Sequence, residues 1–148
     1  MFKHILVPVD GGELSDKVVE QACAFAKETG AHLTFYHAKP GYYPSYMGGE
    51  VLMPDISIDQ AFLSAMDKSA QNLLDEAARV AADTGVACKT LSNDCDSPYE
   101  GIVAAAESQG CDLIFMASHG RRGTSALLLG SETQKVLTHC KVPVLIYR

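Results

Sequence analysis

The residues best suited to chemistry lie in two glycine-containing segments. One is Asp10–Gly12, and the other runs from Ser118-His119-Gly120 across nine residues to Gly130-Ser131. A loop of small residues lets main-chain N–H groups approach an anion closely, and a helix beginning at Ser131 adds unpaired N–H groups and the positive end of its dipole. The spacing therefore indicates a phosphate site in which about three or four peptide groups hold the anion without a dedicated lysine.

Each of these residues also has a purely structural interpretation. Gly130 and Ser131 are explained by a turn and a helix cap, and Asp10 by a turn at the end of a strand. His37 and His119 follow apolar runs, where an imidazole commonly bonds to a backbone group, and no third residue at suitable spacing completes a metal site. The five cysteines are scattered and form no Cys-x-x-Cys pair, so we expect reduced thiols in the core.

Five short apolar runs alternate with helical patterns and must position these residues. The runs are Ile5–Val9, Leu33–Ala38, Val86–Leu91, Leu113–Ala117 and Val142–Tyr147. Strands that alternate with helices are typical of an α/β fold in which helices cover both faces of a parallel sheet. We therefore predict a single-domain, three-layer, doubly wound fold over residues 1–148, with a five-stranded parallel sheet.

Helix boundaries follow from capping signals. An amphipathic helix is predicted over about Leu14–Thr29 and is stopped by Gly30. Capping boxes of the form Ser-x-x-Glu or Ser-x-x-Gln predict three later helices. These begin at Ser57, Ser97 and Ser131 and end near Gly85, Gly110 and Cys140, respectively. The segment Pro40–Ile56 fits no such pattern and is predicted to be a long, mobile loop.

The polarity of the strands predicts their order in the sheet. The first and fourth runs are unbroken and apolar, as expected of central strands, whereas Lys89 and Pro143 suit strands at an edge. Right-handed crossovers then favour the order 3-2-1-4-5, in which the winding reverses between the first and fourth strands. Ligands of such sheets bind at the carboxyl ends of the strands beside that reversal, which here means Asp10–Gly12 and Ala117–Gly123.

Composition and charge exclude several classes of protein. Eighteen acidic against twelve basic residues give a net charge of −6, so nucleic acid is not an expected partner. No stretch longer than ten residues lacks a charged side chain, so we expect no membrane-spanning helix. The first apolar run is closed by Asp10 and is too short for a signal-peptide core, which predicts a cytoplasmic protein.

With these motifs in place, the chain resembles the universal stress protein family in its ATP-binding branch. That branch has the motif Gly-x-x-Gly, nine residues, Gly-Ser/Thr, and here Ala117-Ser-His-Gly120 precedes Gly130-Ser131 by nine residues. The resemblance covers nearly the whole chain. It includes Ile5–Ser15, His37, Leu128–Ser131 and Val142–Leu145. It implies a fold of the adenine nucleotide alpha hydrolase type.

The resemblance also implies a ligand and a set of residues that bind it. The ligand is ATP or another adenine nucleotide, with Mg²⁺ held by phosphate oxygens and Asp10. Ala38 and Met116 are implied to line the adenine. Asp10 is implied to lie near the ribose and phosphates, and Gly120, Gly130 and Ser131 around the phosphates. The implied set is completed by Pro8, Val9, Ala117, His119, Arg121 and Glu132.

Two positions depart from the family motif. Ala117 replaces its first glycine, which places a methyl group on backbone near the nucleotide. Glu132 puts a carboxylate beside the phosphates. Arg121 and Arg122 could offset its charge, although two adjacent arginines in a loop are more typical of a solvated surface. The alternative is therefore a dimerising interaction module that keeps the fold and binds no nucleotide.

The resemblance implies homodimers joined by antiparallel pairing of Val142–Tyr147. We recognise no activated nucleophile or general base. The expected function is that of a regulatory stress-response protein that binds ATP and hydrolyses it slowly at most.

Rival classes fit the residues less well. An ATP pyrophosphatase would carry Ser-Gly-Gly-x-Asp-Ser after the first strand, and Asp10–Ser15 shares only the glycines and the last serine. A phospho-acceptor receiver domain needs a lysine at the end of the fifth strand, whereas Lys141 lies before it. The chain has no Gly-x-x-x-x-Gly-Lys-Ser/Thr motif, which excludes a Walker-type NTPase.

Overall fold

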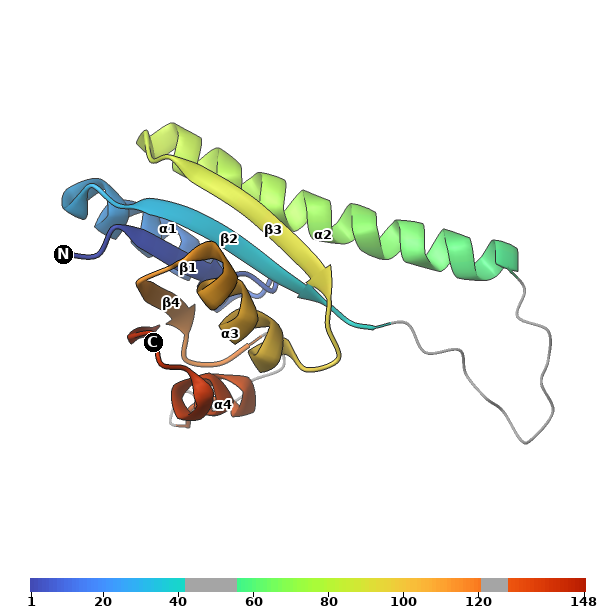
Figure 1. The fold of residues 1–148 in the computed structure, drawn as a ribbon. Coiled ribbons are helices and arrows are strands. Elements are labelled where there is room, and N and C mark those ends of the chain that lie inside the picture. The colour runs from blue at the N-terminus through green and yellow to red at the C-terminus, as the bar shows by residue number, and fades with distance from the viewer. Residues whose placement is uncertain (42–55, 121–127) are drawn as a thin grey trace.

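A parallel sheet lies between two pairs of helices in the computed structural model of the chain (Figure 1). The structure describes residues 1–41, 56–120 and 128–148, without the side chains of residues 56–59. Most of the predicted loop Pro40–Ile56 lies outside the described residues. In chain order the elements are β1 (His4–Pro8), α1 (Glu13–Thr29), β2 (His32–Lys39), α2 (Ile56–Thr84), β3 (Cys88–Asp94), α3 (Pro98–Gln109), β4 (Leu113–Ala117), α4 (Ser131–His139) and β5 (Val144–Tyr147).

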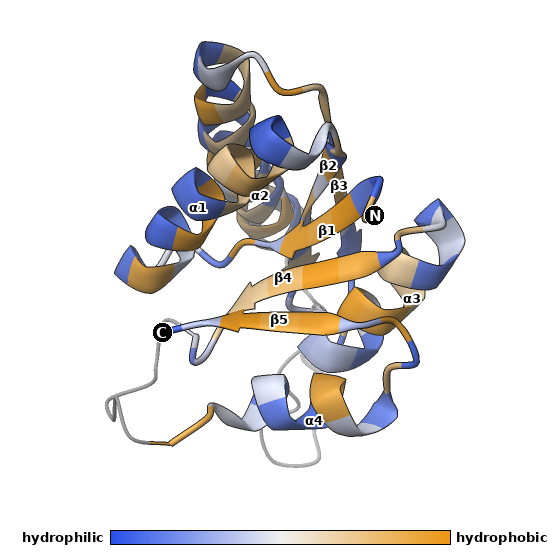
Figure 2. Cartoon of the chain, turned by 90° about the vertical axis from the view of Figure 1, so that its left-hand side faces the viewer, coloured by the Kyte–Doolittle hydropathy of each residue, from blue (hydrophilic) through white to orange (hydrophobic). Residues whose placement is uncertain are grey.

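The sheet has the predicted topology. All of its strands pair in parallel, and their order is β3-β2-β1-β4-β5. The helices α1 and α2 cover one face, and α3 and α4 cover the other (Figure 2). Because the winding direction changes between β1 and β4, the loops that follow these two strands diverge at their carboxyl ends. The predicted reversal is thus confirmed.

Two hydrophobic clusters form the core, one on each face of the sheet. The alternation of side chains along β4 shows how one strand serves both. Leu113 and Phe115 belong to the cluster under α1 and α2, whereas Ile114 and Met116 belong to the cluster under α3 and α4. Both clusters therefore rest on the apolar character of β1 and β4, which are buried between the helical layers.

Two predicted strands have wrong boundaries, and both lie at the edges of the sheet. Val86 is buried but precedes β3, because its N–H donates to the Ala81 carbonyl in the turn that ends α2. β3 then continues to Asp94, since main-chain pairing with β2 does not require apolar side chains at a partly exposed edge. β5 begins at Val144 rather than Val142, after Pro143, which has no N–H to donate.

The helices end at the predicted glycines. Gly30, Gly85 and Gly110 follow α1, α2 and α3 with φ angles of 68°, 76° and 66°. This left-handed conformation is favourable for glycine and strained for other residues. Within the described ranges, no helix has the length and apolarity needed to cross a membrane.

Candidate functional site

The turn after β1 places Asp10 at the start of α1. The Asp10 carboxylate accepts a hydrogen bond from the Gly12 N–H at 2.9 Å, and the Asp10 N–H donates to Ser15 Oγ at 3.2 Å. Gly11, between Asp10 and Gly12, has a φ of 75°, which explains why glycine occupies this position. Gly12 is the N-cap of α1 and has no side chain that could accept a hydrogen bond from the first turn of the helix. The first turn of α1 therefore opens beside Asp10.

The connection from β4 to α4 is fixed by two hydrogen bonds at the end of the sheet. The Gly130 N–H donates to the Ser118 carbonyl at 2.8 Å, and the Thr133 hydroxyl donates to the Ala117 carbonyl at 3.1 Å. Thr133 is 3% exposed, and it was not among the predicted site residues. The only indication in the sequence was that a polar residue lies in the first turn of a short helix, on the side that faces the sheet.

The predicted capping box of α4 is wrong. Gly130 is the N-cap, Ser131 is the first helical residue and is exposed, and no side-chain cap bond forms among the described residues. The cap moves back by one residue because the Gly130 N–H is already bound to the end of β4. The N-terminal amides of α4 consequently have no hydroxyl cap, and they begin where the sequence placed a phosphate.

The two glycine-containing segments meet at the carboxyl end of the sheet. A Cβ added at Gly120 would lie 2.9 Å from Asp10 Oδ2, and one added at Gly130 would lie 3.1 Å from His119 Cα. A side chain at Gly130 would therefore press on the backbone of His119, whereas one at Gly120 would meet only the movable end of the Asp10 side chain. Asp10, His119, Gly120 and Gly130 form one cluster from separate parts of the chain.

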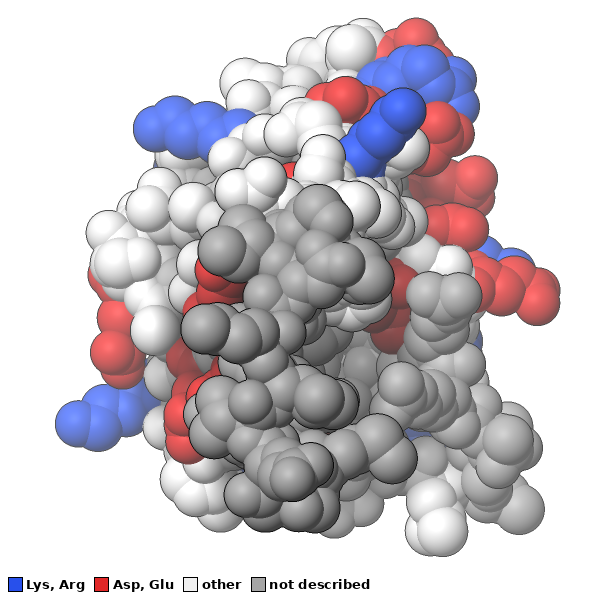
Figure 3. Space-filling model, turned by 90° about the vertical axis from the view of Figure 1, so that its right-hand side faces the viewer, with Lys and Arg blue, Asp and Glu red and all other residues white. Residues whose placement is uncertain are grey.

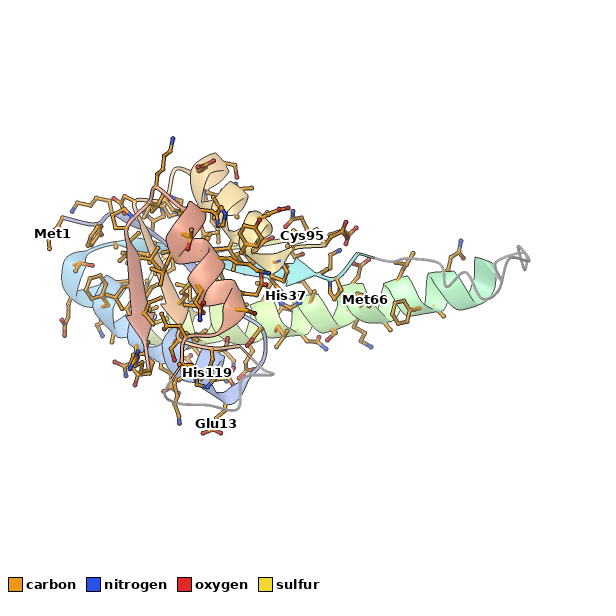
Figure 4. The ribbon with its side chains drawn as sticks, turned by 90° about the horizontal axis from the view of Figure 1, so that it is seen from below. Met1, Glu13, His37, Met66, Cys95 and His119 are labelled. Carbon is orange, nitrogen blue, oxygen red and sulfur yellow. The ribbon has the colours of Figure 1, made fainter. Side chains whose placement is uncertain are left out.

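A cavity of about 350 Å³ opens between these loops. Its lining is Asp10, Gly12, Glu13, Leu14, Ser15, Lys17, His119 and Gly120. Asp10, His119 and Gly120 were predicted as site residues, and Gly12 lies in the predicted segment Asp10–Gly12, but the contribution of the first turn of α1 was not predicted. Figure 4 shows His119 and Glu13 near one another, with His37 apart from them. Residues Gly12–Lys17 follow Asp10 closely in the sequence, and this position could have indicated that they lie beside the site.

Charges around this cavity are mainly acidic. Lys17 pairs with Glu13 at 3.0 Å, and this contact lowers the pKa of Glu13 and raises that of Lys17. Partial burial raises the pKa of Asp16 in the same turn, and the charges of Asp10, Glu76 and Glu20 raise it further. Asp and Glu side chains gather on the right-hand flank of this face in Figure 3, over α1 and α2. A polyanionic ligand here therefore needs main-chain N–H groups or a cation to balance its charge.

The apolar residues of the predicted site divide between the two faces of the sheet. Met116 is buried in the cluster under α3 and α4, and Ala38 packs against that cluster. Pro8 lies two residues after Leu6 of the same cluster, so alternation places it on that face too. Val9 belongs to the cluster under α1 and α2. Pro8, Ala38 and Met116 thus share one face, and Val9 is not with them.

The imidazoles have backbone or neighbouring partners. His37 Nδ1 donates to the Val9 carbonyl at 2.7 Å, which fixes the ring at the end of β2. His119 Nδ1 lies 3.1 Å from Ser118 Oγ. In the part of the chain that the structure describes, no group of three or more His, Cys, Asp or Glu side chains is arranged to hold a metal ion.

The remaining departures from the motif have clear structural outcomes. Ala117 lies in β4, and no described residue other than glycine has a positive φ, so its methyl group causes no backbone strain. Glu132 turns its carboxylate to α3, where Oε2 accepts the Tyr99 N–H at 2.8 Å. Arg121 lies outside the described residues.

Comparisons with known proteins agree with this architecture. A model of the universal stress protein family matches residues 1–148. The chain is 32% identical over 150 residues to the universal stress protein YxiE of Bacillus subtilis, and the match covers 100% of each chain. The solved structure of MJ0577, a universal stress protein of Methanocaldococcus jannaschii, is similar with a TM-score of 0.80 and 25% identity, over 99% of this chain and 95% of that one.

Two other solved structures of similar fold hold nucleotides. One is a universal stress protein in complex with cAMP, with a TM-score of 0.68, 23% identity and coverage of 99% of this chain and 97% of that one. The other is the universal stress protein from Archaeoglobus fulgidus in complex with dAMP, with a TM-score of 0.67, 18% identity and coverage of 100% of this chain and 98% of that one. Since the family model spans residues 1–148 and YxiE is similar over its full length, the chain belongs to the universal stress protein family.

Proposed function

We propose that this protein binds an adenine nucleotide, ATP in the first place, at the carboxyl ends of β1 and β4. It acts as a cytoplasmic regulatory protein of the stress response and hydrolyses ATP slowly at most. The observation that carries the proposal is the start of α4, where Gly130 caps the helix without a side-chain bond and is held against Ser118. The amides that follow are placed to receive phosphate oxygens.

The residues are assigned to parts of the nucleotide by their faces and neighbours. Pro8, Ala38 and Met116 are assigned to the adenine on the α3 and α4 side, where Met116 is buried in the cluster and Ala38 is partly buried against it. Asp10 lies beside Gly120 and is assigned to the ribose and phosphates. The phosphates are assigned to the main chain at Gly120, Gly130 and Ser131, a pattern supported by the small residues there.

Mg²⁺ is proposed to enter with the nucleotide. The described residues offer no three-ligand cluster, but Asp10 contributes one carboxylate next to the assigned phosphates, and Mg²⁺ commonly binds through one or two carboxylates together with substrate phosphates. The acidic groups around the cavity support a bound cation because they repel the bare polyphosphate.

We further propose a homodimer in which β5 pairs antiparallel with β5 of a second copy. β5 is an edge strand whose side chains are all partly exposed, and Figure 2 shows it as an apolar stripe at the border of the sheet. An apolar edge of this kind favours pairing with another strand.

Nucleotide binding is tested by acid extraction of freshly purified protein, followed by chromatography for adenine nucleotides and by calorimetric titration with ATP. The key variant is Gly130→Val, because a side chain at this position presses on His119 and covers the first amides of α4. The matched control is Gly85→Ala at the opposite end of the molecule, where a Cβ meets nothing within 4 Å.

We expect ATP to bind the wild type and the control, and Gly130→Val to lose binding by about tenfold or more, corresponding to the loss of one or two charge-assisted hydrogen bonds. Equal binding to Gly130→Val would place the nucleotide elsewhere. No binding by the wild type would favour the interaction module without nucleotide.

A further inference from the structure

Glu132 joins the starts of two helices. Its Oε2 accepts the Tyr99 N–H in the first turn of α3 at 2.8 Å, and its Oε1 accepts a bond from Lys135 Nζ at 2.8 Å. The expected cap of α3, Ser97, is the N-cap residue but makes no side-chain cap bond. A carboxylate from α4 therefore caps α3 from outside the helix, which is favourable near the positive end of a helix dipole.

The contacts around this bond fix the position of the carboxylate. Lys135 Nζ lies 5.4 Å from the centroid of the Tyr99 ring, and the His139 ring packs against the same ring in a tilted arrangement, with centroids 5.2 Å apart and an angle of 43° between the ring planes. The side chain of Glu132 is 35% exposed and that of Lys135 46%, so solvent screens their charges only in part. Glu132 is thus held in place by α3 and by its own helix.

The place of this carboxylate in the fold links it to the proposed nucleotide site. Glu132 is the second residue of α4, directly after Ser131, to which the phosphates are assigned. The start of α3 lies against the end of β2, because the Cys95 N–H donates to the Lys39 carbonyl at 2.8 Å. The negative charge of the Glu132 carboxylate therefore lies at the end of the site to which the phosphates are assigned, within one turn of the N-terminus of α4.

We propose that Glu132 determines how strongly the site distinguishes adenine nucleotides by their number of phosphates. This inference rests on the proposed function. The bond to Tyr99 keeps the carboxylate beside the phosphate end instead of letting it swing into solvent. Lys135, whose Nζ lies 2.8 Å from Oε1, offsets part of this charge. The remaining repulsion grows with the charge of the ligand, so it weakens the binding of ATP more than that of AMP. AMP consequently competes with ATP better than it would at a site with a neutral residue here.

Two substitutions separate the cap from the charge. Glu132→Gln keeps an oxygen that can accept the Tyr99 N–H but removes the negative charge. Glu132→Ala removes both. The matched control is Glu107→Gln, which removes one exposed carboxylate from the last turn of α3, at the opposite end of that helix from Tyr99. All three variants change the net charge of −6 by one unit, so general charge effects cancel in the comparison.

The first measurement is calorimetric titration of the wild type and the variants with AMP, ADP and ATP at constant ionic strength. We expect Glu132→Gln to raise the affinity for ATP about three- to tenfold and that for AMP less than about twofold, with ADP between them. Glu107→Gln leaves the ratio of the ATP and AMP affinities unchanged. An unchanged ratio in Glu132→Gln, with AMP still bound, overturns the inference alone. Failure of every form to bind any adenine nucleotide overturns the proposed function and this inference together.

The second measurement is hydrogen exchange of the Tyr99 amide in the protein without nucleotide, so it tests the cap independently of binding. We expect slow exchange in the wild type and in Glu132→Gln, and faster exchange in Glu132→Ala. Equal exchange in Glu132→Ala and the wild type shows that the carboxylate is not held at α3, and that result overturns the inference whatever the affinities are.

Discussion

The two ends of the sheet treat their main-chain polar groups differently. At the amino end, α1, α2 and α3 terminate in the left-handed glycines Gly30, Gly85 and Gly110, and the Asp112 carboxylate accepts the N–H groups of Lys3 and His4 at 2.8 and 3.0 Å. These groups are satisfied within the chain. At the carboxyl end, α1 and α4 begin at the glycine caps Gly12 and Gly130, which have no side chain to bind the amides of the first turn, and a cavity of about 350 Å³ lies beside the start of α1.

This difference separates the part of the molecule that stabilises the fold from the part that is available to a ligand. Helix N-termini without side-chain caps have N–H donors to offer, and the reversal between β1 and β4 gathers two of them in one place. α3 is the exception at this end, because Glu132 caps it. Changes at the carboxyl end should therefore affect binding as well as stability, and changes at the amino end should affect stability alone.

The largest effect on stability is expected where α3 packs against β2 at the carboxyl end. A Cβ at Gly101 would collide with the Tyr36 hydroxyl and lie 3.0 Å from Cys95 Sγ. Burial raises the pKa of Tyr36 to about 12, so its hydroxyl stays protonated and donates to Asn93 Oδ1. Gly101→Ala should lower the free energy of unfolding by about 1 to 3 kcal/mol through overpacking. Urea denaturation measures this change.

A double-mutant cycle identifies the cause. In the Tyr36→Phe background the colliding oxygen is absent, so Gly101→Ala should cost at least about 1 kcal/mol less than it does in the wild type. Additive effects of the two substitutions would show that the hydroxyl is not the atom in conflict.

Thr133 tests whether the start of α4 depends on its bond to β4. Thr133→Val keeps the shape of the side chain but leaves the Ala117 carbonyl without this donor, so we expect a loss of about 1 to 2 kcal/mol of unfolding free energy and weaker nucleotide binding. The matched control is Thr138→Val in the same helix, whose exposed hydroxyl bonds only to the Gln134 carbonyl of its own turn. Equal losses of unfolding free energy in both variants would show that the bond from Thr133 to β4 has no special role.

The same contrast between the ends explains what could be predicted from the sequence. Gly30, Gly85 and Gly110 were predicted to the residue, because a left-handed helix end is a local property of one residue. The strand order was also predicted, since it follows from which strands are apolar. The start of α3 at Ser97 was predicted to the residue, but the side-chain cap bonds expected at Ser97 and Ser131 were wrong, because the sequence pattern is local and the actual partners come from other elements.

The cavity was predicted only in part for a related reason. Asp10 and Gly120 were named from their motifs, and the structure places them together. The first turn of α1 was recognised as a helix start but not as a wall of the site. Its role depends on how α1 is oriented over the sheet, which no spacing of residues within the chain specifies.

At the amino end, substitutions of Gly85 should lower the stability of the fold without changing nucleotide binding. Its φ of 76° strains any residue with a Cβ, and no atom lies within 4 Å of an added Cβ, so Gly85→Ala should cost about 1 kcal/mol through the backbone alone. Gly85→Asn should cost less, because asparagine tolerates this conformation better. Thermal unfolding measures both, and ATP affinity should be unchanged. Equal losses for alanine and asparagine would contradict a conformational cause.

The smallest effect is a pH dependence at the amino end. The His4 ring stacks on His32 with centroids 4.0 Å apart, and its Nε2 lies 2.7 Å from Thr34 Oγ1. Burial lowers the pKa of His4 below its ordinary value of 6.5, the charges of His32 and Lys89 lower it further, and Asp112 acts in the opposite direction.

As the pH falls through 6.5, the unfolded chain therefore takes up the proton before the folded protein does. Protonation then favours unfolding, and this contribution to stability is present above that pH and is lost below it. Urea denaturation at a series of pH values from about 7.5 to 5.5 should show falling stability in the wild type and a shallower fall in His4→Gln. Identical slopes would mean that another group carries the pH dependence. Nucleotide affinity per folded molecule should not follow the titration of His4, because the ring lies at the end of the sheet whose polar groups are already paired within the chain.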